Sequence, residues 1–137
     1  MEYVKIRDFN ISKYTLGTVQ LGMEYGIANK TGKPDLSKSF NILRAAASEG
    51  INSFDTSLHY GESERVIGMF FSEEKNLFGS AREPIITTKF KVGMKEEAPE
   101  IEIEKKVREC VEASLENLKI NKIPIYLVHD PGEVYKY

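Results

Sequence analysis

Four side chains able to move protons or stabilise charge recur along the chain: Asp55, Tyr60, Lys89 and His129. Three of them, Asp55, Lys89 and His129, directly follow short apolar runs typical of buried strands. Asp55 and Lys89 are 34 residues apart, and Lys89 and His129 are 40 apart, which is about one strand plus one returning helix. Because parallel strands end at the same edge of a sheet, the spacing predicts that an acid, a phenol, an amine and an imidazole gather there.

These four groups together suit the reduction of a carbonyl. A tyrosine phenol is a sluggish proton donor at neutral pH, and a nearby ammonium makes it more acidic by favouring the phenolate. Lys89 can supply that ammonium, and Asp55 can hold it in place and keep it charged. His129 can donate a hydrogen bond to a substrate oxygen. The carbonyl oxygen would take a proton from Tyr60 while the carbon takes a hydride from a cofactor.

The elements that position these residues follow from apolar periodicity and from glycine and proline punctuation. Strands are predicted over residues 14–22, 51–55, 85–89 and 125–128, and helices over residues 37–49, 63–71 and 104–119. Residues 1–13 are predicted to form a strand or hairpin outside this repeat. The loops after residues 22 and 90 should shape a substrate pocket. Strands that alternate with helices through right-handed crossovers form a parallel sheet.

The length restricts this α/β fold to part of a barrel. A closed eight-stranded (β/α) barrel of the TIM type needs roughly 250 residues, and the chain has 137. The sequence therefore predicts the first four βα units, a half barrel over residues 1–137 that is part of a longer chain. An open sheet of this kind exposes two edge strands and an inner face, so self-association through those edges is expected.

Composition restricts which binding partners and which cellular compartment are expected. The net charge of −2 gives no field that would attract nucleic acid or an anionic membrane. No apolar run approaches the ~20 residues of a membrane span, and the start of the chain lacks the pattern of a signal peptide. The single cysteine, Cys110, suits a reducing compartment, and the cytoplasm is expected. No metal site is expected.

Several motifs resemble those of the aldo-keto reductase family. Asp55-Thr56-Ser57, followed by Tyr60-Gly61 and Ser63-Glu64, is similar to the signature of that family. The segment 86–89 resembles its third-strand lysine motif, 126–131 its fourth-strand histidine motif, and 16–22 its first strand. The resemblance covers nearly the whole chain.

The resemblance implies a catalytic tetrad, a nicotinamide cofactor and a small carbonyl substrate. In this tetrad Asp55 would orient, Tyr60 would be the general acid, Lys89 would tune its acidity, and His129 would steer the carbonyl. The cofactor would be NADPH, or less often NADH. The residues expected near its nicotinamide ribose are Gly17, Thr18 and Gln20, with Asp55 close by.

Other interpretations of the sequence remain open. In the family, later strands supply the residue that stacks on the nicotinamide and the basic residues that bind the phosphates, and this chain has no counterpart of them. The chain could therefore be inactive alone, or serve as a non-catalytic module that assembles with a partner. A third interpretation makes Lys89 a Schiff-base lysine, which a neighbouring Asp55 would disfavour by keeping the amine protonated.

Overall fold

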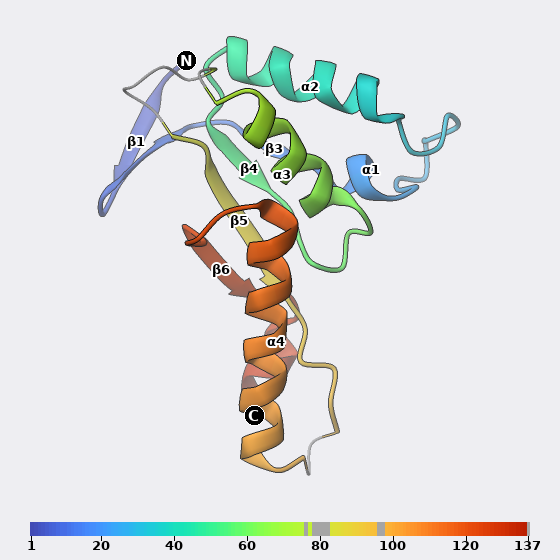
Figure 1. Cartoon of the computed structure of the whole chain (residues 1–137), viewed down its shortest axis with the longest axis vertical. Coiled ribbons are helices and arrows are strands. Elements are labelled where there is room, and N and C mark those ends of the chain that lie inside the picture. Colours follow the sequence, from blue (N-terminus) through green and yellow to red (C-terminus); the bar gives the residue numbers. More distant parts are fainter. Residues whose placement is uncertain (76, 78–82, 96–97, 137) are drawn as a thin grey trace.

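The computed structural model describes residues 1–75, 77, 83–95 and 98–136 (Figure 1). Four strands form a parallel sheet in the order β3-β4-β5-β6, and their bounds are β3 Thr15–Gly17, β4 Ser53–Asp55, β5 Ile85–Phe90 and β6 Ile125–Val128. The helices are α1 Val19–Gly22, α2 Leu36–Ser48, α3 Ser63–Glu73 and α4 Glu100–Leu118, with a short 3-10 helix, η1, at Pro131–Tyr135. The predicted parallel α/β sheet is confirmed.

Helices α2, α3 and α4 pack in sequence order over one face of the sheet (Figure 1). Side chains alternate along a strand, so every second residue points at these helices. On β5, Ile86 packs against Ile67 of α3 and Leu118 of α4, and Phe90 packs against Cys110 of α4. Lys89 directly precedes Phe90, so its side chain points to the opposite face of the sheet. That face lines the interior when such a sheet closes into a barrel.

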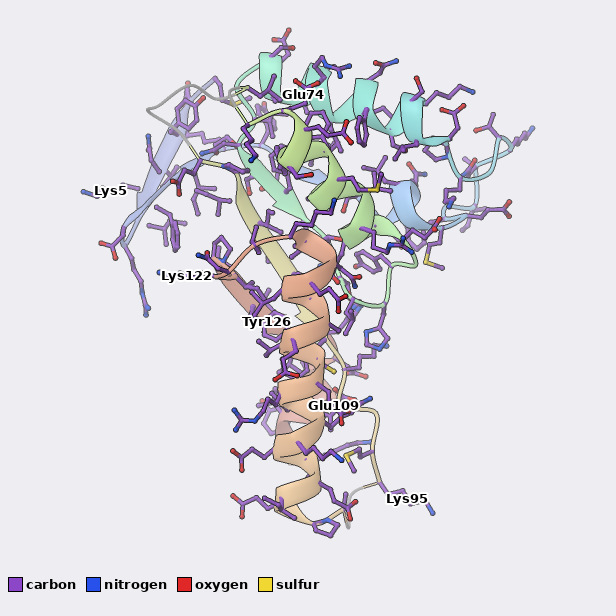
Figure 2. The ribbon with its side chains drawn as sticks, in the orientation of Figure 1. Lys5, Glu74, Lys95, Glu109, Lys122 and Tyr126 are labelled. Atoms are coloured by element: carbon purple, nitrogen blue, oxygen red, sulfur yellow. The ribbon has the colours of Figure 1, made fainter. Side chains whose placement is uncertain are left out.

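Polar and aromatic contacts complete the packing of the helices. Arg44 of α2 donates to Glu74, at the end of α3, across 2.6 Å. On β6, the Tyr126 ring stacks on the Phe90 ring with centroids 4.8 Å apart. Figure 2 shows Tyr126 close to α4. Tyr126 thus belongs to the helix-covered side of the sheet.

The first thirteen residues form the predicted hairpin, β1 (Tyr3–Ile6) paired antiparallel with β2 (Phe9–Ser12). Asn52, just before β4, fixes the hairpin by accepting from the Ser12 backbone N–H at 2.8 Å and donating to the Asn10 carbonyl at 2.9 Å. The hairpin therefore sits at the amino ends of the parallel strands (Figure 1). The carboxyl ends, where the predicted site lies, are at the other end.

The largest differences from the predicted boundaries concern β3 and α4; β4 begins two residues later than predicted and α3 ends two residues later. The strand predicted over 14–22 ends at Gly17, because Thr18 turns the chain and residues Val19–Gly22 form the single-turn helix α1. The Thr18 N–H and hydroxyl both donate to the Asp55 carbonyl, at 3.0 and 2.8 Å, which caps the end of β4. Helix α4 begins at Glu100 rather than at 104, directly after Pro99, where a proline and acidic residues favour a helix start.

Gly68 of α3 provides a test of how closely the helices pack. A Cβ at this position would lie 2.2 Å from the Asn117 carbonyl oxygen of α4, whereas a Cβ at Gly17 would meet nothing within 4 Å. We expect Gly68→Ala to lower the free energy of unfolding by about 1–3 kcal/mol through overpacking. The control Gly17→Ala should change it by less than about 1 kcal/mol. Denaturant unfolding of both variants checks this, and equal stabilities would contradict the packing described.

Candidate active site

An ion pair between neighbouring strands organises the carboxyl end of the sheet. The ammonium of Lys89, on β5, donates to Asp55 Oδ1 at the end of β4 across 2.7 Å, and to the Thr56 carbonyl oxygen across 2.9 Å. The Lys89 side chain is 16% exposed and that of Asp55 is 35% exposed. A charge so sheltered from water needs close compensation, and the carboxylate and the carbonyl supply it. One ammonium proton remains for another partner.

The phenol and the imidazole lie beside this pair. The Lys89 Nζ is 5.0 Å from the centroid of the Tyr60 ring. The His129 ring, which follows β6, meets the Tyr60 ring edge-on, with centroids 5.4 Å apart and planes at 87°. The structure therefore brings together all four side chains that the sequence singled out. Their catalytic roles remain predictions.

Tight packing fixes the turn that carries Tyr60. Its N–H donates to the Ser57 carbonyl at 3.0 Å, and its carbonyl accepts from the Ser63 N–H, the first residue of α3, at 3.1 Å. Gly61 has φ +57°, and a Cβ there would lie 2.4 Å from the Gly22 carbonyl oxygen of α1. Only glycine fits this conformation and this approach.

A buried chain of hydroxyls connects β3, β4 and α3 beneath the site. Thr56 Oγ1 donates to Ser63 Oγ at 2.9 Å, and Ser63 Oγ lies 2.8 Å from Thr18 Oγ1, which donates to the Asp55 carbonyl. Thr18, Thr56 and Ser63 are each 1% exposed or less. Thr56 and Ser63 belong to the segment that resembles the family signature, but the sequence assigned them no role. Their positions on either side of Tyr60 in the sequence were the only indication that they support its turn.

A buried glutamate ties α3 to its neighbours in the same region. Glu64 accepts from the Thr88 hydroxyl of β5 at 2.6 Å and from the Asn117 amide of α4 at 3.1 Å. Both carboxylate oxygens are thus hydrogen-bonded although the residue is almost fully buried. The sequence assigned Glu64 no role either, and in the structure its two hydrogen bonds fix α3, the helix that begins just after the Tyr60 turn.

Ser57 is a further residue that sequence reasoning missed. Its Oγ lies 2.8 Å from Nδ1 of His129 and 3.0 Å from the Lys89 carbonyl oxygen. The side chain is fully buried. No signal in the sequence identified this contact, because 72 residues separate Ser57 from His129.

The surroundings of His129 favour a neutral ring. Burial lowers the pKa of His129 from its ordinary value of 6.5, and the positive charges of Lys91 and Lys89 lower it further. A neutral imidazole carries one ring proton, so at neutral pH it can donate one hydrogen bond and accept another.

The residues predicted near a cofactor lie around the same strand ends. Gly17 pairs in register with Asp55 and leaves open space at its Cα. Thr18 is buried, with its hydroxyl already bonded to the Asp55 carbonyl. The exposed Gln20 donates to the Tyr25 carbonyl at 3.0 Å. Contact of these residues with a cofactor stays a prediction. Gly17 and the partly exposed Asp55 are accessible to a cofactor, whereas the Thr18 hydroxyl is buried and already hydrogen-bonded.

Within the described ranges, no three His, Cys, Asp or Glu side chains lie close enough to hold a metal ion. In the same part of the chain, no helix is both long and apolar enough to cross a membrane.

The model of the aldo/keto reductase family matches residues 13–137. The chain belongs to the aldo/keto reductase family. It is 32% identical over 136 residues to the aldo-keto reductase YhdN of Bacillus subtilis (strain 168), covering 96% of this chain and 38% of that protein. It is 33% identical over 94 residues to the chloroplastic pyridoxal reductase of Arabidopsis thaliana, covering 64% of this chain and 25% of that protein.

Solved structures of aldo-keto reductases share the fold. The crystal structure of a Bombyx mori aldo-keto reductase in complex with NADP has a TM-score of 0.66 and 22% identity, covering 94% of this chain and 38% of that chain. The chain therefore spans about two fifths of the length of such relatives, and the predicted half of a TIM-type barrel is confirmed.

The depressed pKa of His129 has a measurable consequence. We expect its NMR titration in the folded chain to have a midpoint below pH 6.5. The unfolded chain then binds the proton first as the pH falls, so His129 lowers the folding stability below about pH 6.5 and has no such effect above it. With only two histidines in the chain, His129→Gln assigns the resonances. A midpoint at or above 6.5 would contradict the buried, cation-flanked environment.

Proposed function

We propose that this segment supplies the proton-donating half of an NADPH-dependent reductase that converts an aldehyde or ketone to an alcohol. NADH is the second choice of cofactor. The observation that carries the proposal is that the Lys89 ammonium, held by Asp55, and the His129 ring both lie close to the Tyr60 ring. The membership in a family of oxidoreductases supports it.

Each side chain has a step in this proposal. A bound nicotinamide would supply the hydride to the carbonyl carbon. Tyr60 donates its phenolic proton to the carbonyl oxygen as negative charge develops there. Lys89 stabilises the phenolate that forms, since its positive charge is 5.0 Å from the ring centroid. The neutral His129 donates a hydrogen bond that orients the same oxygen.

The substrate class follows from this chemistry and from one relative. In this proposal the Tyr60 hydroxyl and the His129 imidazole donate to the same substrate oxygen, which suits a small carbonyl compound. The similarity to a pyridoxal reductase favours an aldehyde. The chain covers only 38% of its bacterial relative, so we propose that turnover requires the remaining barrel strands and that this chain alone binds NADPH weakly.

The Schiff-base alternative is disfavoured by the same ion pair. Asp55 lies 2.7 Å from the Lys89 Nζ and stabilises the protonated amine, which is not a nucleophile. Borohydride should therefore trap no carbonyl compound on Lys89. Covalent labelling of Lys89 would contradict the reductase proposal and support the Schiff-base alternative.

The Tyr60→Phe substitution tests the proton donor. We expect it to lower carbonyl-dependent NADPH oxidation by about 100-fold or more, the usual contribution of a general acid, with cofactor binding unchanged. The assay uses a chimaera in which residues 1–137 replace the matched region of the Bacillus subtilis relative. Tyr14→Phe, which alters an exposed tyrosine at the amino end of β3, is the matched control. A folded chimaera that binds NADPH and is unaffected by Tyr60→Phe would contradict the proposal.

We also propose that the open sheet self-associates when this chain is alone. Strands β3 and β6 are the outer strands of the sheet, and Leu127 on β6 is 44% exposed. Sedimentation velocity should show a dimer or larger species as concentration rises, and Leu127→Lys should shift it toward monomer. A monomer at all concentrations would contradict this, and assembly with a different partner would favour the non-catalytic module.

A further inference from the structure

Ser57 occupies the junction of three segments of the site. It lies between Thr56, whose carbonyl accepts from Lys89, and the turn that carries Tyr60. Its Oγ accepts from the His59 backbone N–H at 3.1 Å, and it has the Lys89 carbonyl oxygen at 3.0 Å and His129 Nδ1 at 2.8 Å. The side chain is fully buried, so water does not compete for these contacts.

The number of protons limits what Ser57 can do. A hydroxyl has one proton to donate, and two acceptors are in reach: the Lys89 carbonyl oxygen and a bare Nδ1 of His129. If the proton goes to Nδ1, the neutral ring carries its own proton on Nε2. If it goes to Lys89, then Nδ1 must carry the ring proton to bond with Ser57, and Nε2 is left bare.

We propose that Ser57 is a positioning residue that donates to Nδ1 and thereby fixes His129 as the tautomer protonated on Nε2. The contact with Nδ1 is the shorter of the two. The Lys89 carbonyl keeps a partner, because the Leu58 N–H donates to it at 3.0 Å. The His59 N–H occupies a lone pair of Ser57 in either arrangement, so the backbone holds the oxygen in place.

The tautomer decides whether His129 can donate to a substrate. With Nδ1 occupied by Ser57, Nε2 carries the proton that His129 donates to a substrate oxygen. This part of the inference rests on the proposed function. The opposite tautomer would present a lone pair to that oxygen and repel it. Ser57 therefore makes His129 a donor without touching the substrate.

Nitrogen-15 NMR of the histidine rings tests the assignment on the chain as it is. Above the pKa of His129, we expect Nδ1 to resonate as a bare ring nitrogen and Nε2 as a protonated one. His59→Gln keeps the backbone N–H that bonds Ser57 and removes the only other histidine signal. In Ser57→Ala, the two ring-nitrogen resonances should move toward each other as the tautomers mix, and Ser57→Thr, which keeps the hydroxyl, should restore the separation.

Two results would overturn the assignment. One is a protonated Nδ1 in the unsubstituted chain, a measurement that needs no variant to fold. The other is an unchanged pattern in folded Ser57→Ala. Neither depends on turnover, so a reductase proposal that fails in the Tyr60→Phe assay leaves the tautomer result standing, and a wrong tautomer leaves the Tyr60 result standing.

Discussion

The ion pair between Lys89 and Asp55 is the interaction on which the site depends. Strand register places Asp55 opposite Thr87, so Lys89, two residues farther along β5, points to the same face and reaches back to the carboxylate. A sheltered ammonium without that carboxylate would be an uncompensated charge and would move toward water. The ion pair therefore fixes the position of the Lys89 ammonium relative to the Tyr60 ring.

Paired neutral groups hold the surroundings of the ion pair in place. The turn that presents Tyr60 is fixed at Gly61 by its approach to α1, and the buried hydroxyls of Thr18, Thr56 and Ser63 join β3, β4 and α3 directly below it. The hydroxyls in these contacts are neutral and hydrogen-bonded to one another, so burying them costs little free energy. The charged pair of Lys89 and Asp55 lies at the carboxyl end of the strands, and the buried Glu64 has both carboxylate oxygens hydrogen-bonded.

Much of this arrangement could be predicted from the sequence. The apolar runs before Asp55, Lys89 and His129 mark strands, and the parallel topology then requires their ends to meet. The run before His129 was predicted to be buried, but β6 is only partly buried because it is an outer strand of the sheet. The strand predicted through Gly22 was wrong because β-favouring residues such as Val19 carry weak local preferences, and the bonds of Thr18 to the Asp55 carbonyl override them. The role of Ser57 could not be predicted, because a hydroxyl finds its partner only when distant segments fold together.

The central claim, that these residues serve hydride transfer to a carbonyl, is tested most directly by following the hydride. An aldehyde is reduced by the chimaera with NADPH deuterated on the transferring face of the nicotinamide, and the alcohol is examined by mass spectrometry. We predict one deuterium on the carbinol carbon, at a rate that the tetrad residues control. An alcohol without deuterium, or folded, NADPH-binding protein that forms no alcohol at all, would contradict the claim.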